Sequence, residues 1–227
     1  MNIKKALIIA SHPDDDILGC GGIFSKFKGT IDFRVIFIAE GSTARQEKYD
    51  INCKEIKKQI KKRTQYAIKS LKYLGIYNYK FYNLPCGRLD QFPLIEINKI
   101  IENEIKFFQP DTVFTHSDCD SNKDHSKVYD STIIATRPGS GVKNVVSYEV
   151  LSSTEWGFSK IFAPNLFFSL SKKDVNNKWK ALKFYTSETQ PPPHPRSKVG
   201  ITSLSSYRGL QSGNQYAEAF KLIRGII

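Results

Sequence analysis

The stretch KALIIASHPDDDILGCGG, residues 5–22, joins an apolar run to a dense set of chemically active side chains. The run 6–10 has the length and composition of a buried strand, and Ser11-His12-Pro13-Asp14-Asp15-Asp16 follows it directly. Adjacent carboxylates repel one another wherever the fold packs them away from water, which favours a compensating cation. Histidine with carboxylates is a ligand set that holds zinc and leaves one position open. The stretch therefore indicates a metal site, although a solvated acidic turn that caps a helix would give the same pattern.

A second cluster of the same kind follows another apolar run, Thr112-Val113-Phe114. It reads Thr115-His116-Ser117-Asp118-Cys119-Asp120-Ser121-Asn122-Lys123-Asp124-His125 and holds two of the four histidines. In an open parallel sheet, ligands bind beyond the carboxyl ends of the strands, so side chains that follow two different strands can converge on one crevice. Two clusters of histidine and aspartate, each directly following a predicted strand in the sequence, favour the metal site over the solvated turn.

The remaining sequence alternates predicted strands and helices, as a parallel α/β sheet requires. We predict strands at residues 5–10, 33–39, 80–84, 112–115 and 144–151. We predict helices between them at residues 18–27, 55–74, 94–107 and 124–136. Later elements are a strand at 166–170 and helices at 175–184 and 216–224. The prediction is a single domain, residues 1–227, in which segment 151–227 covers the crevice without forming a domain of its own.

Composition and charge narrow the class of protein. The chain has 227 residues, 40% hydrophobic and 12% aromatic, which is enough for a sizeable core. The net charge is +12, but the excess is mostly scattered lysine, and in residues 54–63 (KEIKKQIKKR) the lysines are spaced as on the outer face of a helix. We therefore predict no nucleic-acid partner. No apolar run approaches the roughly 18 residues needed to cross a bilayer, so we predict no integral membrane segment.

Cysteine usage and the chain start favour a cytoplasmic protein. The four cysteines, at positions 20, 53, 86 and 119, have unrelated flanks and no close pair, so we expect reduced thiols. The short apolar start runs into the acidic cluster without a cleavage-type segment.

The glycines of Gly19-Cys20-Gly21-Gly22 do not bind a dinucleotide, because the third glycine of G-x-G-x-x-G would fall at Phe24. They are expected to let the first helix approach the sheet closely.

The motif His12-Pro13-Asp14-Asp15, followed by Leu18-Gly19-Cys20-Gly21-Gly22 and later by Asp124-His125, resembles the zinc-dependent N-deacetylases called PIG-L or LmbE-like. The similarity runs over nearly the full chain and takes in residues 39–45, 87–90, 194–197 and 207–209. These further blocks are similar to the branch associated with surface polysaccharides and sugar modification. The resemblance implies a Rossmann-like three-layer fold. It also implies hydrolysis of the N-acetyl group of an amino sugar or sugar conjugate, which releases acetate and a free amine.

The resemblance also implies roles for four residues of the two clusters. His12, Asp15 and His125 would bind zinc, and a site with three protein ligands leaves room for water and the amide oxygen. Asp14 would be the general base, because it stands beside a ligand without being one. Asp16 is expected to start the helix or to support the site without touching the metal.

Two positions depart from the family pattern. Asn122 stands where several relatives carry a histidine thought to support the tetrahedral intermediate, and an asparagine can donate a hydrogen bond to an oxyanion but no proton. If a general acid is needed, it would come from His194, whose proline-rich surroundings can hold it stiffly, or from His116. Cys86 stands where relatives often show aspartate, so a contact to a sugar hydroxyl is expected to be lost or altered.

Three arginines and a tryptophan are candidates for substrate contact. A guanidinium can hold a phosphate or sugar hydroxyls with defined geometry. Arg45 and Arg88 follow predicted strands, whereas Arg63 lies on a predicted helix and is assigned mainly through the resemblance. Trp156 can stack on a sugar ring, although burial within the tail is the alternative.

Two other functions stay open from the sequence. A metal-dependent glycosyltransferase would use Asp14-Asp15-Asp16 or Asp118-Cys119-Asp120 as a D-x-D motif, but it leaves His12 and His125 unexplained. A non-catalytic relative would bind carbohydrate without zinc or hydrolysis. The predicted partner is an N-acetylated sugar that is free, nucleotide-linked or lipid-linked, and the chain can form a homo-oligomer.

Overall fold

The computed structural model describes residues 2–45 and 53–226, and a seven-stranded sheet forms its centre. The strand order is β3-β2-β1-β4-β5-β7-β6. Five neighbouring strands are parallel: β1 (Lys5–Ala10), β2 (Asp32–Ala39), β3 (Asn78–Leu84), β4 (Thr112–Thr115) and β5 (Asn144–Tyr148). Two more strands complete the sheet: β7 (Tyr216–Arg224) pairs antiparallel with β5, and β6 (Leu166–Leu170) pairs antiparallel with β7. The α/β class with a mainly parallel sheet is thus confirmed.

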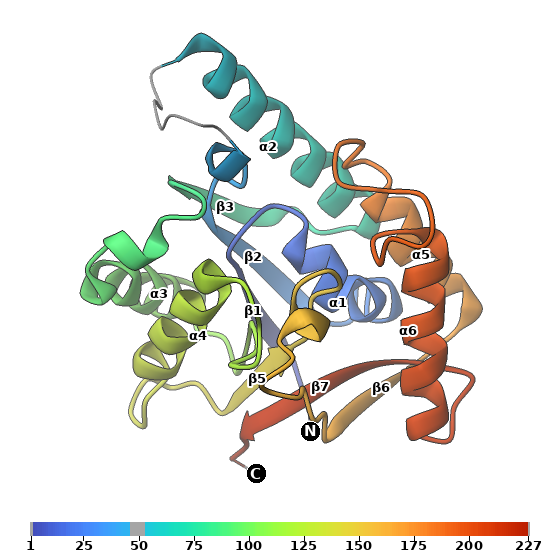
Figure 1. Ribbon diagram of the computed structural model, residues 1–227. Coiled ribbons are helices and arrows are strands. Elements are labelled where there is room, and N and C mark those ends of the chain that lie inside the picture. Colours follow the sequence, from blue (N-terminus) through green and yellow to red (C-terminus); the bar gives the residue numbers. More distant parts are fainter. Residues whose placement is uncertain (1, 46–52, 227) are drawn as a thin grey trace.

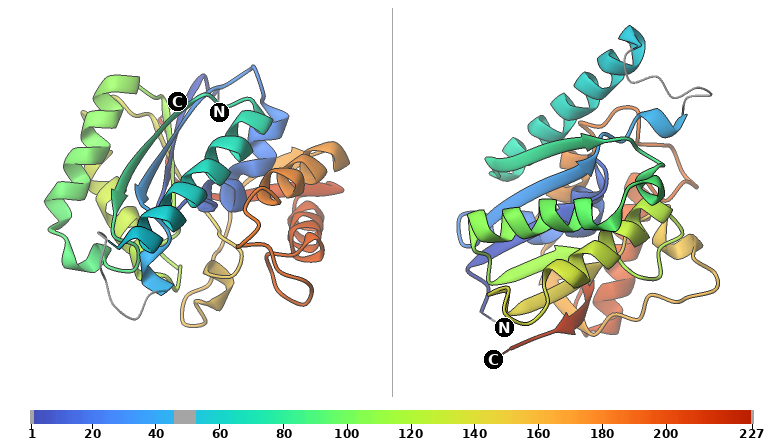
Figure 2. Two further views of the ribbon diagram at one scale, coloured as in Figure 1. Left: turned by 90° about the horizontal axis from the view of Figure 1, so that it is seen from above. Right: turned by 90° about the vertical axis from the view of Figure 1, so that its left-hand side faces the viewer.

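Helices pack on both faces of the sheet (Figures 1 and 2). One face carries α1 (Asp15–Lys26), α2 (Lys54–Leu74), α5 (Lys172–Leu182) and α6 (Lys198–Gln211). The other face carries α3 (Leu94–Phe108) and α4 (Lys123–Ala135). Short 3-10 helices stand in the loops after β2, β3 and β5: η1 (Thr43–Arg45), η2 (Leu89–Gln91) and η3 (Thr154–Trp156). No described helix combines the length and the apolar character that crossing a bilayer requires.

Strand β1 is enclosed on both faces. Ala6, Ile8 and Ala10 belong to the core under α1 and α2, while Leu7 and Ile9 belong to the core under α3 and α4. All five residues have no exposed surface. β1 also lies between β2 and β4, where the order of the parallel strands reverses. A crevice opens at such a point beyond the carboxyl ends of the strands, which is where residues 11–16 lie.

The glycines after β1 serve close packing, as predicted. A Cβ atom on Gly19 would lie 2.2 Å from the ring of Tyr148 on β5, so only glycine fits there. The Tyr148 hydroxyl donates to the Ile9 carbonyl at 2.8 Å. The close contact between Gly19 and the Tyr148 ring holds α1 against the sheet directly beside the acidic cluster.

The predicted helix at residues 216–224 is wrong, because this segment is strand β7. Alanine, glutamate, lysine and leucine are good helix formers, but the segment pairs with a strand on each side, and this pairing overrides intrinsic propensity. The helix of this region is α6, which was not predicted because Gly200, Gly209 and several serines weaken its helical pattern. α1 also begins at Asp15 rather than at residue 18, since the acidic cluster itself forms its first turn.

A buried ion pair ties the last strand to the first helix. Glu218 of β7 accepts hydrogen bonds of 2.7 Å from Lys178 Nζ and from the amides of Gly22 and Ile23 in α1. Lys178 Nζ, on α5, also donates to the Leu18 carbonyl at 2.7 Å. The side chains of Lys178 and Glu218 are 3% and 6% exposed. The pair therefore fixes the C-terminal part of the sheet against α1.

Replacing Glu218 with alanine should lower the free energy of unfolding by about 3–5 kcal/mol, because it leaves the Lys178 ammonium buried without its partner. Urea denaturation measures the loss. Glu102→Ala is the control, since Glu102 pairs with Arg137 at the surface, and such pairs contribute at most about 1 kcal/mol. Equal losses in the two variants would contradict this role of Glu218.

Candidate active site

Three side chains of the two clusters converge at the carboxyl end of β1. His12 Nδ1 and His125 Nε2 each lie 3.2 Å from the same oxygen, Oδ2 of Asp15, and the two nitrogens are 3.3 Å apart. Donor atoms bound at about 2.0–2.2 Å to a tetrahedral zinc ion are about 3.3–3.6 Å from one another. His12 leaves the end of β1, Asp15 begins α1 and His125 lies in the first turn of α4. These residues therefore fit a small divalent cation with three protein ligands.

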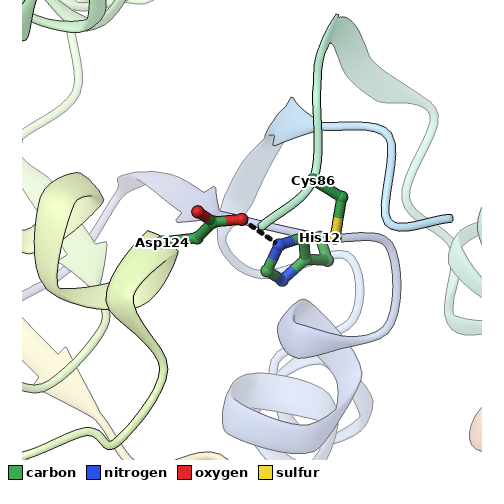
Figure 3. A group of neighbouring side chains, drawn as sticks. All are labelled: His12, Cys86 and Asp124. Atoms are coloured by element: carbon green, nitrogen blue, oxygen red, sulfur yellow. Dashed lines mark hydrogen bonds and ion pairs between the residues drawn. The ribbon is translucent and has the colours of Figure 1, made fainter. Parts of the chain in front are cut away.

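In each of the two histidines, the ring nitrogen that does not face Asp15 lies against a second carboxylate. His12 Nε2 lies 2.9 Å from Asp124 Oδ2, and His125 Nδ1 lies 3.0 Å from Asp120 Oδ2. Figure 3 shows the Asp124 carboxylate, from α4, directed at the His12 ring. Such partners fix the orientation of a metal-binding imidazole and raise its basicity. The sequence interpretation gave Asp120 and Asp124 no such role, although a buried histidine ligand needs a partner for its second nitrogen.

The two carboxylates are themselves held in place. Asp124 accepts the amides of Gly87 at 2.6 Å and Leu89 at 3.1 Å, which anchors the loop after β3. Asp120 accepts the Thr154 hydroxyl at 2.7 Å and also the hydroxyl of Ser153 in the loop after β5. The candidate ligands are therefore positioned by hydrogen bonds that reach the loops after β3 and β5 at the same edge of the sheet.

Burial and charge act in opposite directions on the ligand cluster. Burial alone would lower the pKa of His125, but Asp15 and Asp120 outweigh it and raise this pKa to about 9. Burial would raise the pKa of Asp15, yet His125 and His12 hold it well below its ordinary value. Without a cation the cluster thus pairs ionised carboxylates with protonated imidazoles. Binding a metal ion would displace protons from these nitrogens.

Asp14 stands next to the ligands with one carboxylate oxygen held and the other without a partner among the described residues. Oδ2 lies 2.7 Å from Arg196 Nη1 and 3.0 Å from Arg63 Nη2, whereas buried Oδ1 accepts no hydrogen bond. Burial raises the pKa of Asp14, and the two arginines oppose this rise. Its backbone has φ 122°, a conformation that costs a non-glycine residue about 1–3 kcal/mol and that clusters at functional sites.

Two arginines from distant parts of the chain meet at Asp14. Arg63 is buried on the inner side of α2, donates to the Pro13 carbonyl at 3.2 Å and pairs with Glu188. Arg196 comes from the segment before α6 and donates to Ser152 Oγ at 2.6 Å and to Glu188 at 3.2 Å. The sequence interpretation gave Arg196 and Glu188 no role; the block at 194–197 was the signal that could have pointed to Arg196. The lysines of α2 at positions 57, 58, 61 and 62 are exposed, as predicted.

A cleft of about 370 Å³ opens over these groups, and His12, Asp14, Asp15 and His125 all line it. Asn122 lines it as well and is the N-cap residue of α4. Its Oδ1 accepts the Asp124 amide at 2.9 Å, which directs its NH₂ group away from the helix. Trp156 lines the cleft and is 47% exposed. Arg63 lines it too, so the structure brings together most of the predicted site residues.

The two candidate acid histidines lie apart from this cleft lining. His116 is wholly buried: its ring stacks on His125 at 3.9 Å, and its Nε2 accepts the Ser11 amide at 2.8 Å. Burial lowers the pKa of His116 well below its ordinary value, and the charge of His125 lowers it further. His194 is half-buried, lies 6.3 Å from the Trp156 ring, and accepts the Arg196 amide on Nδ1 at 3.1 Å.

The remaining candidates lie around this edge of the sheet. Arg88 is half-buried directly before η2, and it is not among the described residues that line the cleft. Arg45 ends η1, and its side chain lies outside the described part of the chain. Asp16 is buried in the first turn of α1 and accepts the Asp14 amide at 3.3 Å. Asp118 pairs with Lys221 at 3.6 Å while Asp120 faces His125, so this D-x-D motif does not converge on one point.

This fold and site define a class, the α/β proteins with a candidate hydrolytic metal site at the carboxyl edge of a parallel sheet. The family model described as PIG-L, GlcNAc-PI de-N-acetylase, matches residues 7–136, and the chain belongs to the PIG-L family. No curated protein matches the chain.

Solved structures with the same fold have several activities in their descriptions. N,N′-diacetylchitobiose deacetylase from Pyrococcus horikoshii is 19% identical, with a TM-score of 0.76 over 99% of this chain and 85% of that one. Teicoplanin deacetylase Orf2 is 16% identical, with a TM-score of 0.75 over 98% and 99% of the two chains. GalB, a 4-carboxy-2-hydroxymuconate hydratase from Pseudomonas putida, is 18% identical, with a TM-score of 0.72 over 99% and 98%. At these identities the similarity shows the fold alone.

Replacing Asp120 with asparagine should weaken zinc binding by about 10–100-fold, because His125 loses the carboxylate that orients it. Competition with a chromophoric chelator measures the affinity. Asp118→Asn is the matched control, since Asp118 belongs to the same segment but pairs with Lys221. Equal losses of zinc affinity in the two variants would instead support a D-x-D metal site, because such a site uses both aspartates.

Proposed function

We propose that this chain is a zinc-dependent N-deacetylase that hydrolyses the N-acetyl group of an amino sugar or sugar conjugate and releases acetate and a free amine. One observation carries the proposal: three ligand atoms lie within 3.3 Å of one another, and the cleft that they line also holds Asp14. The description of the family, GlcNAc-PI de-N-acetylase, supports the reaction. The deacetylases that act on diacetylchitobiose and teicoplanin support the substrate class.

The residues present fit zinc, with His12, Asp15 and His125 as its ligands. A zinc ion in such a site polarises an amide carbonyl and lowers the pKa of water. Asp14 supplies the proton acceptor: Oδ1 has no protein partner among the described residues, and Oδ2 is fixed by Arg63 and Arg196. A fixed carboxylate next to the reacting atoms can take the proton of the attacking water.

Asn122 is suited to stabilise the negative charge that develops on the amide oxygen. Its NH₂ group is a hydrogen-bond donor whose orientation is set by the cap bond to Asp124. The leaving amine needs a proton, and Asp14 can return the one that it has taken. His194, beside Trp156 at 6.3 Å, is the alternative donor. His116 is the less suitable candidate, because its Nε2 already accepts the Ser11 amide.

Substrate binding is assigned to the rim of the cleft. Trp156 offers an exposed ring face for a sugar, and Arg88 and Arg45 are placed on neighbouring loops for hydroxyl or phosphate groups.

We further propose that residues 1–227 form one Rossmann-like three-layer domain in which segment 151–227 covers the crevice. Trp156, Glu188 and Arg196 support this, because all three come from that segment and either line the cleft or pair with its residues. A cytoplasmic location is part of the same proposal.

Asp14→Asn should keep zinc in the three-ligand site and lose about 10²–10⁴-fold in turnover, because the amide cannot accept the proton. Acetate release across a panel of N-acetylated sugars, sugar nucleotides and glycolipids, with and without a chelator, measures the activity. Asp90→Asn, an exposed change in the neighbouring loop, should retain wild-type turnover.

The outcomes separate the competing functions. Full activity in Asp14→Asn would remove this residue from the mechanism. Manganese-dependent sugar transfer without acetate release would favour the glycosyltransferase, and sugar binding without hydrolysis would favour a non-catalytic binding protein.

A further inference from the structure

A second group of metal-ligating atoms lies around His12 (Figure 3). The Cys86 thiol, a His12 ring nitrogen and an Asp124 carboxylate oxygen lie within 4.8 Å of one another. His12 presents two nitrogens in different directions: Nδ1 faces Asp15 and His125, whereas Nε2 faces Asp124. The second group is therefore distinct from the three-ligand site, although both use the same imidazole.

The backbone that carries Cys86 is held firmly at this position. The Cys86 amide donates to Glu40 Oε1 at 2.9 Å, and its carbonyl accepts the Thr43 hydroxyl at 3.4 Å. The next amide, that of Gly87, donates to Asp124 Oδ2 at 2.6 Å. The thiol and the Asp124 carboxylate are thus fixed to each other through the loop, as a preorganised ligand pair requires.

The group is also accessible to an ion. Cys86 and His12 both line the cleft, so an ion can enter from solvent and keep one position open toward it. Asp124 Oδ2 has a second lone pair that can serve as a ligand while the oxygen still accepts the Gly87 amide. Thiolate, imidazole and carboxylate together suit zinc or cobalt, and the thiolate favours a softer ion such as cadmium.

We propose that Cys86, with His12 and Asp124, forms a second metal site at the edge of the cleft. Its occupation displaces the Cys86 and His12 Nε2 protons to solvent and separates His12 from the carboxylate that orients it. An ion in this site therefore disturbs the neighbouring three-ligand site through the shared ring. The second site does not depend on the proposed deacetylation, because it is defined by binding alone.

Titration of the metal-free protein with Co²⁺ tests the proposal, because a thiolate ligand gives a near-ultraviolet charge-transfer band that nitrogen and oxygen ligands do not give. We expect this band in the wild-type protein and its loss in Cys86→Ser. Cys119→Ser is the matched control, since both cysteine residues are 8% exposed, and it should keep the band. His125→Ala, which removes a ligand of the three-ligand site, should keep it too.

Zinc-edge X-ray absorption of the wild-type protein with two equivalents of zinc provides a measurement that needs no variant. A sulfur atom at about 2.3 Å from zinc is expected. Absence of both the band and the sulfur contribution would overturn the proposal, and so would a band that survives in Cys86→Ser. Loss of the band in His125→Ala would overturn it as well, because Cys86 would then be an additional ligand of the first ion. None of these results depends on acetate release.

Discussion

The structure depends on the position of β1, which is buried on both faces and paired on both edges. Its apolar residues alternate between the two cores, so the chain can turn polar only where the strand ends. That end lies between β2 and β4, and the helices that follow these strands, α2 and α4, pack on opposite faces of the sheet. The segments that follow β2 and β4 therefore diverge beside residues 11–16. They leave a crevice into which the side chains of these residues converge.

Burying so many ionisable groups in that crevice requires a partner for each. Asp15 lies against two imidazoles, and Asp120 and Asp124 hold those imidazoles from behind. Removing one member of such a set would leave a buried charge uncompensated, which is far more costly than the pair is stabilising. The same reasoning explains why the C-terminal segment is part of the site, since Arg196 and Glu188 complete the charge balance around Asp14 and Arg63.

The sequence predicts the parallel half of the fold well because its signals there are local. Apolar runs of strand length end at His and Asp clusters, and Gly75 and Pro110 stand where the helices α2 and α3 end. It also predicts that His12, Asp15 and His125 meet. The C-terminal half is predicted poorly because its structure depends on distant partners. Segment 216–224 becomes a strand through pairing with β5 and β6.

The same limit applies to the site residues supplied by that half. Arg196 reaches Asp14 only through the path of the chain between α5 and α6, which no local pattern records. Glu188, in addition, belongs to none of the motifs that the sequence analysis identified. The chemistry of the two clusters indicated a metal site and the family resemblance named its candidate ligands, whereas the residues that position these side chains became visible only with the tertiary structure.

Three imidazoles lie within one cluster, and their hydrogen bonds decide which role each can have. His12 and His125 each direct one nitrogen at Asp15 and the other at a supporting carboxylate. His116 instead accepts the Ser11 amide on Nε2 and stacks on His125, and its Nδ1 is buried without a partner among the described residues. A neutral ring in that place connects the ends of β1 and β4 and supports the face of the His125 ring without adding charge. Because a protonated His116 would face the charge of His125 at stacking distance, the packing that brings the ligands together also keeps this third histidine neutral.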